Sequence, residues 1–120
     1  MTWTKVYESV FVESGCVGGG ACHQSAMAPS KLALGDQAMA YKDLINVAAM
    51  GMNLPGGTTA PNCGGTGVMR VKPGDPDNSL LVQKLEEKQK CGSAMPPGGG
   101  LEPEKVTLVR DWVKAGAKMD

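Results

Sequence analysis

Residues 15–24 read GCVGGGACHQ. The stretch holds two of the four cysteines, Cys16 and Cys22, and the only histidine of the chain, His23. A histidine directly after the second of two cysteines is typical of covalent haem attachment, where the usual pattern is C-x-x-C-H. Here five residues separate the two cysteines. The sequence therefore allows two interpretations, a stretched attachment site or a disulfide loop that ends in histidine.

Haem attachment needs two thiols that add to the two vinyl groups on one edge of the porphyrin, and an imidazole that reaches the iron. His23 meets the second need, because a thioether at Cys22 anchors the backbone one residue away. The glycines at 18–20 make an outward bulge sterically easy, which would bring Cys16 back beside Cys22. A Cys16–Cys22 disulfide across the same bulge, with His23 as an ordinary surface residue, is the alternative.

A second candidate ligand lies in the later stretch CGSAMPPGGG. Met95 precedes two prolines there, and a residue before proline is pushed into an extended conformation. A stiff loop would therefore present its thioether, and histidine with methionine is a standard haem ligand pair that raises the reduction potential. The alternative is that Met95 fills the core. Met69 is the second choice as ligand, whereas Met39 and Met50 fit better as packing residues of a helix.

The composition describes one small domain, over residues 1–120, with a modest core. Hydrophobic residues make up 42% of the chain and aromatic residues only 4%, so the largest contributors to core burial are scarce. A disulfide, a metal or a large cofactor would help to fill the interior. Lys plus Arg and Asp plus Glu each number 12, and this balance speaks against a nucleic-acid partner. No segment approaches the run of about 18 apolar residues that a membrane span needs.

Hydrophobic periodicity predicts an all-α chain with about four helices. Their expected bounds are Trp3 to Ser14, near Asp36 to about Met50, a third helix after Asp75 and Pro76, and Pro103 to Gly116. Asp36 and Asp75 are suitable N-caps, the prolines suit a first turn, and glycine is a typical C-terminal stop. Long Gly- and Pro-rich loops separate the helices at 15–35, 51–76 and 91–102, and the run 68–71 is too short to count as a strand.

Two side-chain expectations accompany these helices. Trp112 is expected to pack on the first helix or on the edge of a haem. The stretch KLEEKQK, residues 84–90, is expected to form a solvent-exposed face with ion pairs inside its own helix.

The order of these pieces resembles a known family. After Cys16, Cys22 and His23 come VKPGDPDNSLLVQKL, then MPPGG, and finally VTLVRDWVKAGA. This order is similar to that of the class I c-type cytochromes, and most of all to the planctomycete-type cytochrome c domains that are also common in myxobacteria. The resemblance runs from about residue 6 to residue 117. It implies a cytochrome c-like fold, in which the helices and long loops wrap around one haem.

The resemblance also implies a function and a set of ligands. It implies one covalent haem c held by Cys16 and Cys22, with His23 and Met95 as the axial ligands of the iron. It implies electron transfer with redox partner proteins rather than enzymatic turnover, by a monomer in the periplasm or elsewhere outside the cytoplasm. An export signal would then lie outside this sequence. The spacing between the two cysteines departs from the two residues that the family mostly has.

Two further features are interpreted with this family in mind. Cys63 and Cys91 are either two free thiols or a pair, and the compartment in which haem c is attached favours a disulfide. We therefore predict a Cys63–Cys91 bridge that anchors the loop of Met95. Arg70 either pairs with a haem propionate, whose carboxylate matches a guanidinium, or is a solvated loop charge.

Other functions remain open on the sequence. One is a haem-free domain of the same fold, held by Cys16–Cys22 and Cys63–Cys91 disulfides, that acts as a binding or structural module. Another is a copper-binding protein that uses His23, methionines and thiolates, since soft sulfur ligands favour Cu(I). A peroxidase has less support, because it needs an open distal site and an acid–base group, and the only histidine is already used.

Overall fold

The structure, a computed structural model, describes residues 2–14, 16, 34–49, 63, 66–91, 95 and 100–119. Within these ranges the regular structure is helical and includes no named strand, as the all-α prediction expects. In chain order the elements are α1 (Trp3–Val6), η1 (Tyr7–Val12), α2 (Gln37–Leu44), η3 (Pro76–Asn78), α3 (Leu80–Leu85) and α4 (Pro103–Lys114).

The first predicted helix is present, but most of it is π-helical. The Thr2 side chain accepts a hydrogen bond from the Lys5 backbone N–H at 3.1 Å and so caps α1. From Tyr7 onward the backbone widens into η1, in which the Glu13 N–H donates to the Glu8 carbonyl at 3.1 Å. The predicted apolar stripe is confirmed, since its five members are all buried: Trp3, Val6, Tyr7, Val10 and Phe11.

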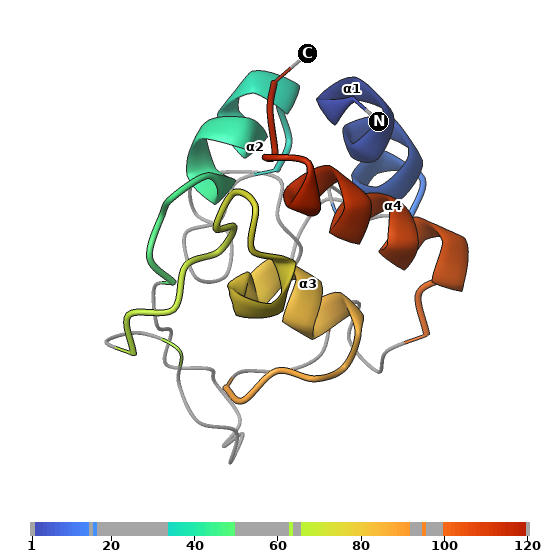
Figure 1. Cartoon of the computed structure of the whole chain (residues 1–120). Helices are drawn as coiled ribbons and strands as arrows, with labels where there is room; N and C mark the ends of the chain where they lie inside the picture. Colours follow the sequence, from blue (N-terminus) through green and yellow to red (C-terminus); the bar gives the residue numbers. More distant parts are fainter. Residues whose placement is uncertain are drawn as a thin grey trace, which may run out of the picture.

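The first helix packs against α4 through two tryptophans. Trp3 stacks on Trp112 with ring centroids 5.0 Å apart and an interplanar angle of 29°. In Figure 1 the N-terminal helix, in blue, accordingly lies beside α4, in red. Each side chain is at most 1% exposed. The prediction that Trp112 packs on the first helix is confirmed.

Around this pair the structure gathers every aromatic residue of the chain, which has two Trp, two Tyr and one Phe. Tyr7, Phe11 and Tyr41 each lie with their ring centroid within 5.8 Å of the Trp3 centroid. These rings form the centre of the main core, which comprises Trp3, Val6, Tyr7, Val10, Phe11, Leu34, Ala40, Leu44, Val71, Val82, Leu85, Val109, Trp112, Val113 and Ala117. Such aromatic contacts contribute about 0.5–1.5 kcal/mol each beyond the burial of their area.

The C-terminal end of α4 is closed by a Schellman motif. Gly116 has a φ of 111°, a conformation that glycine adopts without steric cost. Its N–H donates to the Val113 carbonyl at 3.0 Å, and the Ala117 N–H donates to the Trp112 carbonyl at 2.9 Å. The Tyr41 hydroxyl donates to the Ala117 carbonyl at 3.0 Å. The predicted stop at Gly116 is confirmed, and it ties the end of the chain to the aromatic cluster.

Helix α2 begins as predicted but ends earlier. The Asp36 carboxylate caps it by accepting a hydrogen bond from the Met39 N–H at 2.9 Å. The helix stops at Leu44 rather than near Met50, which lies outside the described residues. The prediction that Met39 is a packing residue is wrong. Its side chain is 49% exposed, because Ala40 and Leu44 supply the buried side of this short helix.

Pairing with a distant segment explains why α2 ends where it does. Residues 45–49 run alongside 68–71, and three backbone hydrogen bonds of 2.8–3.0 Å join them: Asn46 N–H to Val71 O, Arg70 N–H to Val47 O, and Ala49 N–H to Val68 O. The contact amounts to isolated bridges rather than a strand. In the sequence, the apolar periodicity of a helix continues through 45–49. The end of α2 can therefore be located only when the pairing of 45–49 with 68–71 is known.

The third predicted helix is split by a buried serine. Pro76 opens the short 3₁₀ turn η3, and α3 begins only after Ser79. The Ser79 hydroxyl accepts from the Lys72 N–H at 2.8 Å and donates to the Asp75 carbonyl at 2.9 Å. Asp75 occupies the predicted N-cap position, but it begins the short η3 rather than α3. Its side chain makes no capping hydrogen bond, because the carboxylate accepts from the Asn78 side-chain amide at 2.8 Å.

The ionisation of Tyr7 is expected to make the core less stable at alkaline pH. Its hydroxyl is buried and donates to the Leu34 carbonyl at 2.8 Å. Burial raises the pKa of Tyr7, and the negative charge of Asp36 acts in the same direction. The neutral phenol is therefore favoured in the folded state.

We predict that the free energy of unfolding falls as pH rises above about 10, the ordinary tyrosine pKa, because the unfolded chain then releases the proton first. The loss continues until the pH passes the higher pKa of the folded state. Denaturant titrations across this range should show a shallower dependence in Tyr7→Phe than in the natural chain. Equal slopes in the two proteins would contradict the assignment to Tyr7.

Candidate functional site

Cys16 lies where the first helix ends. Its N–H donates to the Phe11 carbonyl, five residues back, at 2.9 Å, after the Ser14 N–H has donated to the Val10 carbonyl, four residues back, at 3.1 Å. The side chain is half-buried and packs against the main core. The thiol of the first predicted attachment residue is thus held at the edge of the apolar interior.

Helix α4 fixes this end of the first helix through Lys105. The Lys105 ammonium lies 3.5 Å from a Glu13 carboxylate oxygen and 3.4 Å from the Ser14 hydroxyl. Lys105 is largely covered, with 18% of its side chain exposed, whereas Glu13 is exposed, so water and salt still screen this pair. The segment that leads into Cys16 is therefore attached to α4 as well as to its own helix.

Met95 also packs against the main core, from the other half of the chain. Its side chain is half-buried there, and its N–H donates to the Lys84 carbonyl in α3 at 3.2 Å. It lies outside the described helices, as the loop prediction expects. The structure thus places two of the predicted haem residues, Cys16 and Met95, on one apolar cluster.

The other two residues of the predicted ligand set, Cys22 and His23, lie outside the described residues. Their roles remain predictions from the sequence. The two prolines that follow Met95 also lie outside the described residues. The described part of the candidate site therefore consists of one thiol, one thioether and the core surface on which both lie.

Arg70 is buried rather than solvated. Only 5% of the residue is exposed, and its guanidinium donates to the Asp43 carbonyl near the C-terminal end of α2 at 2.8 Å. Burial lowers the pKa of Arg70, while the negative charge of Asp43 partly opposes that effect. The interpretation of Arg70 as a solvated loop charge is therefore wrong, and its pairing with a propionate stays a prediction.

The second-choice ligand, Met69, lies in the paired segment that ends α2. Its side chain is half-buried, and its carbonyl accepts a hydrogen bond from the Leu80 N–H at 2.9 Å. Bridges to Ala48 and Ser79 fix its backbone from two sides. Met69 is thus built into the scaffold between α2 and α3.

The predicted Cys63–Cys91 disulfide is confirmed. The two Cα atoms are 5.1 Å apart, and both residues are buried in a second small cluster with Leu80. The bridge joins residues 28 positions apart, and Met95 follows Cys91 by four residues. It therefore joins Cys91, four residues before Met95, to a distant part of the chain.

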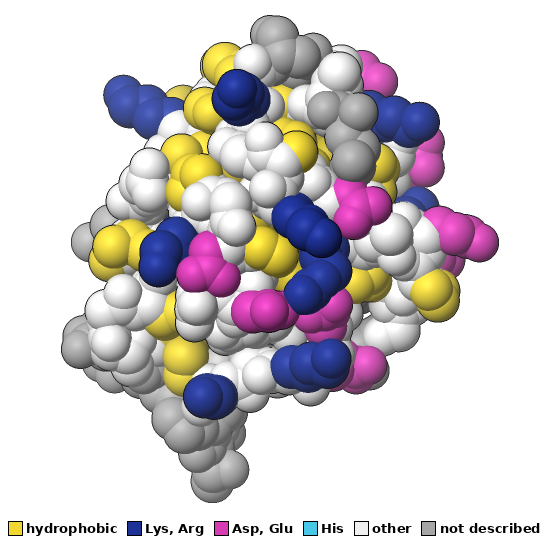
Figure 2. Space-filling model, in the orientation of Figure 1, with side chains coloured by type: hydrophobic (Ala, Val, Ile, Leu, Met, Phe, Trp, Pro, Cys, Tyr) yellow, Lys and Arg dark blue, Asp and Glu magenta, His cyan; other side chains and the backbone are white. Residues whose placement is uncertain are grey.

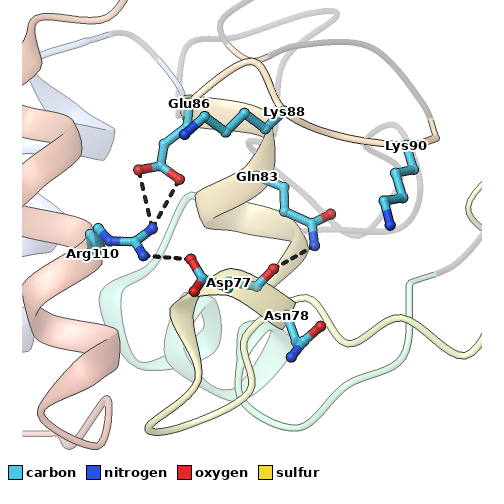
Figure 3. Close-up of a pocket in the computed structure, with 7 residues that line it drawn as sticks. All are labelled: Asp77, Asn78, Gln83, Glu86, Lys88, Lys90 and Arg110. Atoms are coloured by element: carbon cyan, nitrogen blue, oxygen red, sulfur yellow. Dashed lines mark hydrogen bonds and ion pairs between the residues drawn. The ribbon is translucent and has the colours of Figure 1, made fainter.

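An arginine clamp is the feature that sequence reasoning missed. In Figure 2 basic and acidic side chains lie close together over α3 and α4. In this region the Arg110 guanidinium donates to both carboxylate oxygens of Glu86, at 3.0 and 3.2 Å, and also to the Asp77 carboxylate (Figure 3). The hydrogen bond with Asp77 is the main cause that raises the pKa of Arg110.

The clamp corrects the interpretation of KLEEKQK. That stretch was expected to pair within its own helix, but α3 ends at Leu85 and the partner of Glu86 is on α4. The three residues of the clamp come from η3, the end of α3 and α4. No spacing along the chain signals such a contact.

Within the described ranges, no group of three or more His, Cys, Asp or Glu side chains is placed to hold a metal ion. None of the helices in that part of the chain is long and apolar enough to cross a membrane. No protein-family model, curated protein or solved structure matches the chain.

We predict that Cys63→Ala/Cys91→Ala lowers the free energy of unfolding by about 3–4 kcal/mol, because the bridge restricts the unfolded chain in the loop-entropy model. Equilibrium denaturation of the two proteins measures the difference. Non-reducing peptide mapping of the natural chain should yield the two cysteine peptides linked. Alkylation of both cysteines without prior reduction would refute the bridge.

Proposed function

We propose that the protein transfers electrons outside the cytoplasm by means of one covalently bound haem c. Cys16 and Cys22 form the thioethers, and His23 and Met95 bind the iron. One observation carries the proposal, namely that Cys16 and Met95, distant in the chain, are both half-buried on the same apolar core. The resemblance to c-type cytochromes, which covers most of the chain, selects this function among those open to such a site.

The chemistry of the described residues suits a haem. A thiol can form the thioether, and a thioether sulfur is an established axial ligand for haem iron. Both side chains are partly covered by the same apolar core, so that core would supply apolar contacts to a bound haem. The bound haem would supply a reversible one-electron change at its iron.

The protein's own contribution is to hold these groups still. The end of η1 and Lys105 fix the backbone that leads into Cys16. The Lys84 carbonyl and the nearby Cys63–Cys91 bridge fix the segment that carries Met95. As a weak neutral ligand, the Met95 thioether would favour ferrous iron and raise the potential.

In this proposal Arg70 would face a propionate. A guanidinium pairs with a carboxylate through parallel hydrogen bonds, and such pairing offsets the cost of burying a cation. Arg70 is buried beside Asp43, whose negative charge already favours the guanidinium, and a propionate would add a second carboxylate to the same cation.

The Cys63–Cys91 disulfide bears differently on the two alternative functions, the copper-binding protein and the haem-free module. A copper-binding protein loses two of its four candidate thiolates, because Cys63 and Cys91 are joined. A haem-free module keeps the bridge and requires a second one between Cys16 and Cys22. The state of these two cysteines therefore separates the haem protein from the module.

We predict that the chain, produced together with a c-type maturation system, is red and has the mass of one haem added to its 12.4 kDa. Intact-mass measurement and a haem-stained denaturing gel test this directly. With both thioethers formed, Cys16→Ala and Cys22→Ala should each keep the haem on the gel through the remaining bond, and only the double variant should lose it. If only one thioether forms, Cys16→Ala should leave the haem attached whereas Cys22→Ala should not. A colourless protein with the bare-chain mass and a Cys16–Cys22 disulfide would refute the proposal in favour of the module.

A further inference from the structure

Beside the arginine clamp lies an open hollow of about 460 Å³. It is lined only by polar and charged residues, which are Asp77, Asn78, Gln83, Glu86, Lys88, Lys90 and Arg110. Figure 3 shows these side chains around it, with the three clamp residues on one side and Lys90 on the other. Its volume is in the range of small-ligand sites, whereas its lining lacks the apolar walls that most such sites have. A ligand of this hollow must therefore be recognised by charge and hydrogen bonds.

The charges of the hollow do not cancel. Arg110 bonds the carboxylates of both Asp77 and Glu86, so the two negative groups share one cation. Lys88 and Lys90 are exposed, and among the described residues neither forms an ion pair. The hollow thus carries three cations and two anions, and the cations without an ion pair are the two lysines.

The backbone places these lysines before any ligand arrives. Glu87 has a left-handed φ of 60°, an unfavourable conformation for a residue with a side chain, and it turns the chain back at the end of α3. The next N–H, of Lys88, then donates to the Gln83 carbonyl at 2.8 Å. Lys90 directly precedes Cys91, whose disulfide fixes the other end of the turn. Only the lysine side chains remain to be ordered on binding.

Two amides add donors to the same space. The Gln83 amide nitrogen donates to the Asp77 carbonyl at 2.8 Å, and the Asn78 amide nitrogen donates to an Asp75 carboxylate oxygen at 2.8 Å. Each amide nitrogen carries two hydrogens, and these bonds use one of them. The lining therefore combines two ammonium groups with further neutral N–H donors.

We propose that this hollow binds a small anion with two linked oxyacid groups, of the pyrophosphate type. Hydrogen bonds from ammonium groups to phosphate or carboxylate oxygens are the strong, charge-assisted kind. Figure 3 draws Lys88 on the side of Glu86 and Lys90 on the opposite side, so an anion with two linked groups can offer one group to each lysine, whereas a single-group anion is limited to one of them. The proposal does not depend on the haem, because none of the seven lining residues belongs to the predicted ligand set.

Calorimetric titration of the natural chain with inorganic pyrophosphate, at low and moderate salt, tests the site. We expect saturable binding with one anion per chain, and weaker binding of inorganic phosphate. Lys88→Gln/Lys90→Gln should weaken pyrophosphate binding by about tenfold or more, because both charge-assisted contacts are lost. Glu86→Gln should strengthen it, because a negative charge leaves the lining while the side chain keeps its size.

The matched control is Lys42→Gln/Lys114→Gln, which removes the same charge from two exposed lysines outside the hollow. Its affinity should stay within about twofold of the natural chain, since exposed distant charges are screened. An equal loss in both double variants would show non-specific charge attraction and overturn the site. No saturable binding, or unchanged binding in Lys88→Gln/Lys90→Gln, would also overturn it, and an acidic protein surface would then be the occupant to test.

Discussion

The stacking of Trp3 on Trp112 is the contact on which the rest of the structure depends. The chain has few aromatic residues, and all of them lie in the cluster around this pair. Because Trp3 begins the first helix and Trp112 lies near the end of α4, one contact joins the two ends of the chain. The Schellman motif after α4 and the hydroxyl of Tyr41 then fix the tail over the same cluster.

This arrangement determines what the candidate site can be. Once the first helix is held against α4, Lys105 reaches the end of that helix and Cys16 lies on the rim of the core. Helix α3 packs on the same core through Val82 and Leu85, and its Lys84 carbonyl accepts a hydrogen bond from the Met95 N–H. The core therefore acts as the common support of the thiol and the thioether, although neither residue belongs to the aromatic cluster itself.

Most features that depend on neighbouring residues were predicted, apart from the packing of Met39 and the capping bond of Asp75, and long-range contacts explain the other differences. The apolar stripe of the first helix, the Asp36 cap and the Gly116 stop depend on neighbours in the chain, so the sequence was sufficient to find them. The end of α2 and the clamp around Arg110 depend on contacts with segments far away in the chain. Hydrophobic periodicity, a local pattern, cannot predict such contacts. The burial of Arg70 accompanies the same distant pairing, because Arg70 lies in the segment 68–71 that pairs with residues 45–49, where the last predicted turn of α2 was expected.

The most direct test of the account is the near-infrared spectrum of the ferric, haem-loaded protein, where a sulfur–iron bond gives a weak charge-transfer band. If the core presents Met95 to the iron, the natural chain shows this band. Met95→Ala abolishes it and opens the iron to added cyanide or imidazole, while the haem stays attached. Met69→Ala, the matched control in the scaffold, keeps the band. A band that survives Met95→Ala, or one that Met69→Ala removes, would contradict the account.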